Sequence, residues 1–449
     1  MTGLTVKDIA RLVGGVSNGD GAASVRDVVI DSRQVGQGSM FAALPGEKAD
    51  GHDYITKALD AGAACCLALR VPEGERRPVI TVPDVAKALA VLAEKYRKMF
   101  SLPVIGIVGS VGKTTSKEMV AAVLSQKYKV LKTEKNLNNE LGVPLTLFRL
   151  SPEYGAAVIE MGISDFGEMT RLAKMVRPDM VVYTVIGASH LDNLHDRAGV
   201  LKAKTELLPF LRPQGTVFVN GDDDMLAGLD CRRRKISFGI AAENDVRAEN
   251  IASDADSTDC EIALGDRRIP VTIPAYGRQM VYAALSGAAV GLNMGLDDAA
   301  IARGIASYKT VGRRASVIDT GFITLVDDCY NANPNSVKCA VDSLKMLPGR
   351  KVCVLGDMLG LGESGERLHL EVGQYAGENG AELILTAGEL ARGIDAGAAK
   401  TGAQTVHFDT SAKLIAALPE YIKKGDAVLV KASHAMKFEE VSEAIKKLS

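Results

Sequence analysis

The sequence predicts an α/β protein of three domains, and three observations support this fold class. The chain has 449 residues, enough for about three domains of ordinary size. Apolar, strand-like runs alternate with helical stretches, as in a mostly parallel sheet, at 104–108, 156–161, 181–186 and 216–219. The same alternation returns near the C-terminus and predicts a second doubly wound unit, with strands at 323–327, 351–355, 382–386 and 426–431.

We expect these domains to cover residues 1–100, 101–311 and 312–449. In the first, short apolar runs at 28–30, 40–43 and 79–82 predict strands. A helix should follow over 84–100, because Val85, Leu89, Leu92 and Tyr96 have helical spacing. In the second, a β-rich insertion over 236–274 and a helix of small residues over 277–292 should follow the parallel strands.

Composition narrows the class of protein. Hydrophobic residues make up 47% and charged residues 24%, as in globular proteins. A net charge of -2 gives no global field that would favour nucleic acid or an anionic membrane. Residues 1–10 lack the apolar core of a signal peptide, and no apolar run is long enough to span a bilayer. Seven cysteines without a C-x-x-C pair predict reduced thiols and a cytoplasmic location.

The segment 104–124 carries the strongest functional signal. A predicted strand ends in Gly109-Ser110-Val111-Gly112-Lys113-Thr114-Thr115, and a helical pattern follows. Strand, glycine-rich loop and helix form the context in which backbone N–H groups and a helix N-terminus bind phosphate. Lys113 should then reach the terminal phosphates and Thr114 should hold Mg²⁺. The strict pattern has Gly at the position of Ile107, whereas the shorter form from Gly109 to Thr114 is intact.

Other strands of the same predicted sheet end in polar groups. Glu160 closes an apolar strand, and such a carboxylate commonly holds Mg²⁺ opposite a phosphate loop. His190 follows the next strand, so it should face the same edge of the sheet, where its imidazole could ligate a cation or position a phosphate. Lys204, taken by itself, reads as part of a solvated helix face.

Together these motifs resemble the Mur ligase family. The central unit contributes the phosphate loop with Lys117-Glu118-Met119, the stretch 136–146, Glu160-Met161-Gly162, and Ser189-His190-Leu191 with Lys204. The third unit contributes the stretches 327–336 and 354–362. The first contributes Asp31-Ser32-Arg33, Phe41-Ala42-Ala43 and Asp50-Gly51-His52. The resemblance covers nearly the whole chain in order, and it is most specific to the branch that uses D-alanyl-D-alanine.

The resemblance implies a uridine-nucleotide domain, a central P-loop ATPase domain with a parallel sheet, and a Rossmann-like C-terminal domain. It implies ATP- and Mg²⁺-dependent ligation of D-alanyl-D-alanine to UDP-N-acetylmuramoyl-tripeptide through an acyl phosphate, in cytoplasmic peptidoglycan synthesis, by a monomer.

It also implies site residues. The catalytic group would be Lys113, Glu160, His190 and Lys204, with Lys204 carbamoylated by CO₂. Metal ions would be held by Thr114, Glu160, His190 and Lys204. The nucleotide would contact residues 109–115, Arg313 and Asp328. The other substrates would contact Ser32, Arg33, Asn138, Asn139, Tyr330, Asn331 and Asn333.

The chain also departs from the family pattern. Gln279 and Ala283 replace a His and an adenine-contacting Asn, which predicts relaxed purine selectivity unless another group reads the base. Cys329 replaces a Ser, and Ala432 and His434 replace a Gly and an Arg. Two alternatives therefore stay open: a ligase of the same superfamily acting on another carboxylate, and a P-loop nucleotide-binding regulatory protein that has lost ligation.

Overall fold

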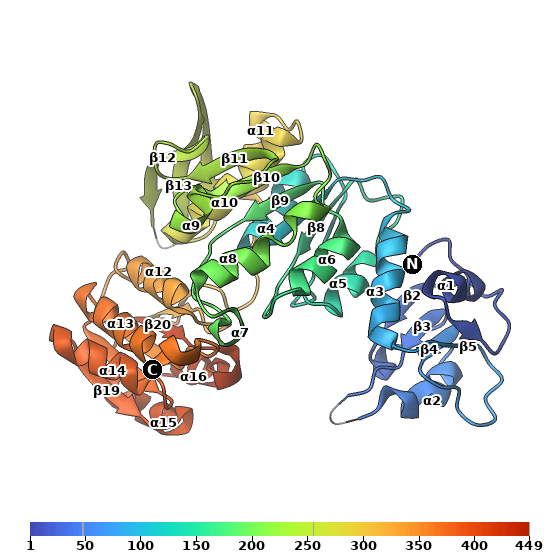
Figure 1. Cartoon of the computed structure of the whole chain (residues 1–449). Coiled ribbons are helices and arrows are strands. Elements are labelled where there is room, and N and C mark those ends of the chain that lie inside the picture. The colour runs from blue at the N-terminus through green and yellow to red at the C-terminus, as the bar shows by residue number, and fades with distance from the viewer. Residues whose placement is uncertain (47–48, 255, 449) are drawn as a thin grey trace.

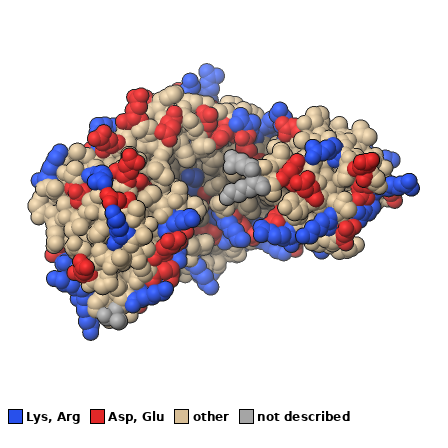
Figure 2. Space-filling view, turned by 90° about the horizontal axis from the view of Figure 1, so that it is seen from below, with Lys and Arg blue, Asp and Glu red and all other residues tan. Residues whose placement is uncertain are grey.

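The computed structural model describes residues 1–46, 49–254 and 256–448. Three sheets follow one another along an elongated molecule, with the N-terminal unit at one end and the C-terminal unit at the other (Figure 1). The expected three-unit α/β fold is thus confirmed. Acidic and basic side chains are interspersed over the face drawn in Figure 2, as the small net charge predicts.

The first sheet has the order β1-β5-β4-β3-β2 and is parallel except for β1. Its strands are β1 (Val16–Ser17), β2 (Asp27–Val29), β3 (Ser39–Ala42), β4 (Cys65–Ala68) and β5 (Val79–Thr81). The helices are α1 (Val6–Val13), α2 (Ile55–Asp60) and α3 (Val85–Arg97), with short 3-10 turns η1 (Ser32–Gln34) and η2 (Gly51–Tyr54).

Helix α3 joins the first unit to the second. Asp84 caps its N-terminus by accepting from the Lys87 N–H. At the other end Arg97 is 2% exposed and donates to the carbonyls of Phe100 and Val176, the latter in the central unit. This buried guanidinium bonds backbone carbonyls on both sides of the junction and so ties the end of α3 to the central unit.

The central sheet has nine strands in the order β14-β13-β12-β11-β10-β9-β6-β8-β7. Its parallel part comprises β6 (Val104–Val108), β7 (Val130–Lys132), β8 (Ala156–Glu160), β9 (Met180–Tyr183), β10 (Thr216–Asn220), β11 (Arg234–Gly239) and β12 (Val246–Ser253). Strands β13 (Thr258–Leu264) and β14 (Arg267–Ile273) add an antiparallel edge. The expected β-rich insertion therefore extends the parallel sheet itself.

Helices cover both faces of this sheet. One face packs against α4 (Lys113–Leu124), α10 (Arg278–Asn293) and α11 (Asp298–Ala306). The other packs against α5 (Gly142–Leu147), α6 (Glu168–Val176) and α8 (Arg197–Thr205). Alternate residues of β6 enter the two cores, Ile105 and Ile107 on one side and Val104 and Val108 on the other. Burial on both faces explains why these strands read as continuous apolar runs. Short helices α7 (Leu191–Leu194) and α9 (Asp224–Ala227) and the 3-10 turn η3 (Leu208–Phe210) complete the unit.

The third sheet has the order β15-β16-β20-β17-β18-β19, with only β15 antiparallel. Its strands are β15 (Ser316–Asp319), β16 (Thr324–Asp327), β17 (Lys351–Gly356), β18 (Leu383–Ala387), β19 (Gln404–Phe408) and β20 (Ala427–Lys431). The helices are α12 (Pro334–Leu344), α13 (Gly365–Glu378), α14 (Arg392–Ala398), α15 (Ser411–Tyr421) and α16 (Glu439–Ile445), with 3-10 turns η4 (Gly362–Ser364), η5 (Ala399–Thr401) and η6 (His434–Met436).

Some sequence-based bounds were wrong. The strand expected over 181–186 ends at Tyr183, because its last residues turn into the loop that supports the phosphate loop. Strands β7, β15 and β19 lay outside the expected runs, since each is a short or edge strand with mixed polarity. No helix within the described residues is both long and apolar enough to cross a membrane.

Candidate active site

The phosphate loop lies between β6 and α4. A Cβ at Gly109 would fall 1.9 Å from the Thr184 hydroxyl oxygen, so this position requires glycine. Gly112 has a φ of 80° and stands directly before Lys113, the first residue of α4. Thr184 donates to the Val111 carbonyl at 2.5 Å, and the Ser110 N–H donates to the Val185 carbonyl at 2.7 Å. These contacts fix the loop at the N-terminus of α4, and helix N-termini bind anions.

Lys113 is half-buried, and its ammonium donates to the Gly109 carbonyl at 2.8 Å. Burial lowers the pKa of Lys113; the charge of Glu160 acts in the opposite direction, and that of Arg314 lowers the pKa further. The Lys113 ammonium therefore bonds back onto its own phosphate loop.

Thr114 and Glu160 form a buried pair. The Thr114 hydroxyl donates to Glu160 Oε2 at 2.9 Å, and Asn138 Nδ2 donates to Oε1 at 2.8 Å. Thr114 is 6% exposed and Glu160 is 2% exposed. A hydroxyl and a carboxylate side by side offer the hard oxygen ligands that Mg²⁺ takes beside nucleotide phosphates, so these residues fit that ion. In the described part of the chain, no three His, Cys, Asp or Glu side chains lie close enough together to hold a metal ion by themselves.

Lys117 completes this network, and the sequence reasoning gave it no role of its own. It lies one helical turn after Lys113 and is 1% exposed. Its ammonium donates to the Thr133 carbonyl at 2.7 Å and lies 3.0 Å from Glu118 Oε1 and 3.8 Å from Glu160 Oε2. The spacing of Lys117 from Lys113 could have indicated this role, because residues four apart lie on the same helix face. Lys117 balances the charge of Glu160 and fixes the carboxylate's place.

Lys204 is buried in α8, with 1% of its surface exposed. Among the residues that the structure describes, no carboxylate forms an ion pair with it. Burial, and then the charge of Lys113, lower the pKa of Lys204 well below its ordinary value. The expectation of a solvated helix face, drawn from local sequence, was therefore wrong, and a neutral amine is favoured here.

His190 lies in the loop between β9 and α7 with a φ of 55°. Partial burial lowers the pKa of its imidazole, and the charges of Lys204 and Lys113 lower it further. This lowering of the pKa favours the neutral form of the His190 ring.

The third unit meets the central one beside this loop. The Leu191 N–H donates to the Gly360 carbonyl at 2.8 Å. A Cβ at Gly187 would lie 3.0 Å from Asn335 Oδ1, so the start of α12 abuts the loop after β9. Farther out, Ser343 donates to Gln279 Oε1 at 2.8 Å, and Tyr276 donates to the Ser343 carbonyl. The third unit therefore contacts the central unit at the loop after β9 and at the start of α10.

Their side chains are largely engaged within the third unit. Asp328 Oδ2 accepts from the Lys431 ammonium at 2.6 Å. Arg313 pairs with Asp327 at 3.0 Å and with Glu443 at 2.7 Å. Asn333 caps α12 by accepting from the Ser336 N–H at 2.9 Å.

Tyr330 is the aromatic centre of this surface. Arg314 stacks on its ring, with Cζ 3.7 Å from the centroid, and the His434 ring lies 5.5 Å away. The Asn331 side-chain oxygen accepts from the Ala332 N–H at 3.0 Å. Tyr330 and Asn331 thus bring an aromatic ring and an amide to the loop between β16 and α12.

The remaining predicted residues lie apart or serve local structure. Asn139 accepts from the N–H groups of Leu141 and Gly142, at 3.2 and 2.8 Å, and so holds the start of α5. Ser32 and Arg33 lie on η1 of the first unit, where Arg33 pairs with Asp31 at 2.8 Å. That pairing lowers the pKa of Asp31 to about 2. Figure 1 shows the first unit on the opposite side of the central unit from the third.

Two residues that depart from the family pattern are buried, and one of them also forms a hydrogen bond. Ala283 is 2% exposed and belongs to the core between α10 and the central sheet. Cys329 donates to Asp327 Oδ1 at 3.0 Å, and burial raises the pKa of its thiol to about 12.

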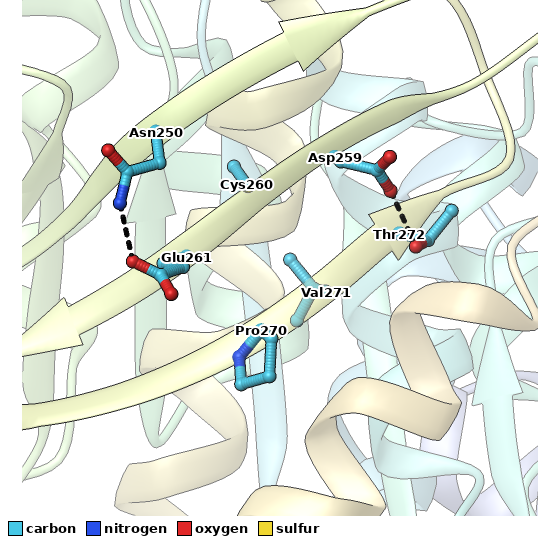
Figure 3. Close-up of a pocket in the computed structure, with 7 residues that line it drawn as sticks. All are labelled: Asn250, Asp259, Cys260, Glu261, Pro270, Val271 and Thr272. Carbon is cyan, nitrogen blue, oxygen red and sulfur yellow. Dashed lines mark hydrogen bonds between the residues drawn. The ribbon is translucent and has the colours of Figure 1, made fainter.

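Two surface concavities lie away from this site. One, of about 320 Å³, is lined by β13, β14 and Asn250; Figure 3 shows Asn250 pointing toward Glu261 and Thr272 toward Asp259. The other, of about 410 Å³, lies between β11, β12 and α10. Neither includes a predicted site residue.

All three units of the chain match models of known protein families. Residues 24–97 match the description "Mur ligase family, catalytic domain", residues 107–291 "Mur ligase middle domain", and residues 313–434 "Mur ligase, glutamate ligase domain". The UDP-N-acetylmuramoyl-tripeptide--D-alanyl-D-alanine ligase of Bacillus subtilis (strain 168) is 36% identical over 446 residues, covering 97% of each chain. The ligase of the same name from Escherichia coli (strain K12) is 35% identical over 425 residues, covering 93% of each.

Solved structures are also similar to this chain over nearly its whole length. A crystal structure of MurF from Acinetobacter baumannii has a TM-score of 0.90 at 28% identity and covers 99% of both chains. MurF ligase from Thermotoga maritima in complex with ADP has a TM-score of 0.83 at 29% identity, covering 94% of this chain and 97% of that one. Matches in all three units, and relatives that extend over nearly the whole length, place this chain in the Mur ligase family.

Proposed function

We propose that this chain is an ATP-dependent ligase that joins D-alanyl-D-alanine to UDP-N-acetylmuramoyl-tripeptide in peptidoglycan precursor synthesis. Two relatives that carry this reaction in their names are 36% and 35% identical to it. The observation that carries the proposal is the buried pair of Thr114 and Glu160 at the phosphate loop, joined by a hydrogen bond of 2.9 Å. This pair suits a nucleotide with its Mg²⁺, which an ATP-driven ligation requires.

In the first step the loop N–H groups and Lys113 bind the ATP phosphates. Thr114 and Glu160 would hold Mg²⁺, which would screen the phosphate charge. The terminal carboxylate of the tripeptide attacks the γ-phosphorus, the bond to the β–γ bridging oxygen breaks, and ADP leaves with that electron pair. The protein contributes position and charge stabilisation rather than a covalent group of its own.

In the second step the amine of the dipeptide attacks the acyl carbon. The bond from this carbon to the phosphate oxygen breaks, inorganic phosphate leaves, and the nitrogen loses a proton. We assign Tyr330 and the amides of Asn331 and Asn333 to the zwitterionic dipeptide, because amides offer both donors and acceptors. The Asn333 oxygen already caps α12, so its NH₂ group is the part assigned to the ligand.

Lys204 acts as a carbamate in this proposal. A neutral amine is the form that attacks CO₂, forming an N–C bond and releasing a proton. The burial that lowers the pKa of Lys204 supports this reaction. The resulting anion, with His190 as its neighbour, would hold a second Mg²⁺.

Each of the three units is assigned its own part in substrate binding. We assign residues 1–100 to the uridine nucleotide through Ser32 and Arg33, residues 101–311 to ATP, and residues 312–449 to the ribose through Asp328 and to the dipeptide. Asn138 and Asn139 lie beside Glu160 and are assigned to the tripeptide end. The enzyme acts as a monomer in the cytoplasm, where its nucleotide substrates are made.

The test is release of phosphate from ATP with UDP-N-acetylmuramoyl-tripeptide, with and without D-alanyl-D-alanine, and product mass by mass spectrometry. We expect release to require both substrates and the product to gain the mass of the dipeptide. Tripeptides ending in lysine and in diaminopimelate are run in parallel. Ligation of a different carboxylate, or hydrolysis that ignores the dipeptide, would favour another ligase or a regulatory nucleotide-binding protein.

A further inference from the structure

The short helix α7 carries His190 at its start in a strained backbone conformation. His190 has a φ of 55°, and His195, directly after the helix, has a φ of 68°, values that are uncommon for residues with a Cβ. The four helical residues between them cannot hold this conformation alone, because a single helical turn is costly to form. Such backbones persist where neighbouring elements enforce them. The His190 ring makes no capping bond to α7, so the position of the ring depends on this backbone.

One side of this segment rests on the phosphate loop. Ser110 Oγ donates to the Gly187 carbonyl at 3.1 Å, and Ser189 Oγ donates to Ser110 Oγ at 3.1 Å. Ser110 belongs to the same loop as Gly109, whose carbonyl accepts from the Lys113 ammonium. The residue directly before His190 therefore touches the phosphate loop, and the start of α7 lies beside it.

The other side rests on a turn of the third unit, residues 359–362, which we call the Gly360 turn. The Leu191 N–H donates to the Gly360 carbonyl at 2.8 Å. A Cβ on Gly362 would lie 3.3 Å from Asp192 Oδ1 and 3.4 Å from the Asp192 nitrogen, and a Cβ on Gly360 would lie 3.8 Å from the His190 nitrogen. Both glycines have left-handed backbones, with φ values of 74° and 54°. Glycine at these positions thus lets the turn approach the backbone of α7 closely.

The Gly360 turn is also tied to the surface assigned to the dipeptide. The Leu359 N–H donates to Ser433 Oγ at 2.8 Å, and the Ser433 N–H donates to the Asp357 carbonyl at 3.0 Å. The next residue, His434, donates its backbone N–H to Asn331 Oδ1 at 3.4 Å. Hydrogen bonds between neighbouring segments therefore connect Asn331 to the turn, and the turn to α7.

We propose that the Gly360 turn is the positioning element for His190: docked on α7, it holds the backbone that carries this imidazole beside the phosphate loop. The inference rests on the proposed function and deepens it, because it gives the third unit a part in phosphoryl transfer for which none of its side chains has to reach the nucleotide. Without the turn, the Leu191 N–H would lose its acceptor and the strained start of α7 would relax. The His190 ring would then leave its place, and groups that act in transfer depend on exact placement.

The first test is hydrogen exchange measured by mass spectrometry on the whole protein without substrates, comparing Gly362→Val with wild type. A valine side chain at position 362 would press on Asp192, so α7 should lose its contact with the turn. Peptides covering residues 187–196 should then exchange about two- to tenfold faster, as expected when one hydrogen bond of ordinary net strength is lost. Peptides covering β17 should keep the wild-type exchange, which would show that the third unit remains folded.

Gly402→Val is the matched control. Gly402 lies in the third unit and has a left-handed backbone with a φ of 82°, but a Cβ there would meet no heavy atom within 4 Å. This variant carries similar backbone strain without touching α7, so exchange over residues 187–196 and kcat should match wild type. If Gly362→Val unfolds the third unit, Gly362→Ala replaces it, since its Cβ requires Asp192 to move by only a few tenths of an ångström.

Turnover then separates positioning from general damage. In Gly362→Val, kcat should fall about 10- to 100-fold while KM for ATP stays within twofold, because a displaced catalytic group slows transfer more than binding. In a His190→Ala background the same substitution should cause no further loss, since residues that act as one unit are not additive. Wild-type exchange over 187–196, kcat within threefold of wild type, or a full further loss in the His190→Ala background would each overturn the proposal. The exchange measurement needs no substrate, so its failure is distinct from failure of the proposed reaction.

Discussion

Replacing Thr114 with Val tests the metal site most directly. Val keeps the shape of Thr and has a methyl group in place of the hydroxyl. In the structure this hydroxyl donates to Glu160 Oε2 at 2.9 Å, between side chains that are 6% and 2% exposed. A hydrogen bond to a buried charged acceptor contributes about 1.5–3 kcal/mol. The variant should lose about that much free energy of unfolding before any ligand is added, a loss that thermal and denaturant unfolding can measure.

The same hydroxyl oxygen is the proposed Mg²⁺ ligand, so losing it should raise the half-saturating Mg²⁺ concentration. If the lost interaction is of similar size, the rise is roughly 10- to 150-fold, at 1.4 kcal/mol for each factor of ten. The assay is phosphate release at fixed ATP with Mg²⁺ varied from micromolar to tens of millimolar. Saturating Mg²⁺ should recover much of the rate.

Thr114→Ser is the matched control, because Ser restores the hydroxyl without the methyl group. It should follow the wild-type Mg²⁺ curve within a few-fold. If the Val variant also followed the wild-type curve, the hydroxyl would not be a metal ligand, and the pairing with Glu160 would be structural only.

Three further predictions follow from the same site. Lys113→Ala should lower kcat by orders of magnitude, since a unit charge about 4 Å from the transferring group contributes about 4 kcal/mol at an effective dielectric constant of 20; turnover within tenfold of wild type would contradict the assignment. Lys204→Ala should be nearly inactive and partly restored by short-chain carboxylates, and full activity in CO₂-depleted buffer would exclude the carbamate. The sequence predicted that Ala283→Asn raises the ratio of kcat/KM for ATP over GTP, but position 283 is 2% exposed. We therefore expect a buried amide to cost about 1–3 kcal/mol of stability with little change in that ratio, and a raised ratio at unchanged stability would show that this position reads the base.

Much of the fold was readable from local patterns. Parallel strands buried on both faces appear as apolar runs, so β6, β8, β17 and β20 were located to within about two residues. The phosphate loop could be recognised because its chemistry depends on contiguous residues: a glycine whose place admits no Cβ, then Lys113 and Thr114 at a helix start. Glu160 could be predicted as a site residue because the carboxyl ends of parallel strands lie at the same edge of a sheet.

The burial and ion pairing of individual side chains could not be predicted from local sequence patterns. Lys204 stands among polar neighbours in α8, yet it is buried and has a lowered pKa beside Lys113, which is 91 positions earlier in the numbering. Lys117 looked like an ordinary helix lysine, although its ammonium lies 3.8 Å from Glu160 Oε2 at the end of β8. Each depends on contacts between segments far apart in the chain.

The sequence by itself determined the order of the elements, the phosphate loop and the family, because these are encoded in contiguous residues and their spacing. Tertiary structure alone decided how two adjacent arginines are held, one by carboxylates and the other on an aromatic ring. Arg313 and Arg314 have the same side chain and nearly the same neighbours in sequence. Asp327 and Glu443 take up the first, and the Tyr330 ring supports the second. Charge compensation and stacking arise only when β16, α16 and the loop before α12 come together, so no local pattern could distinguish the two.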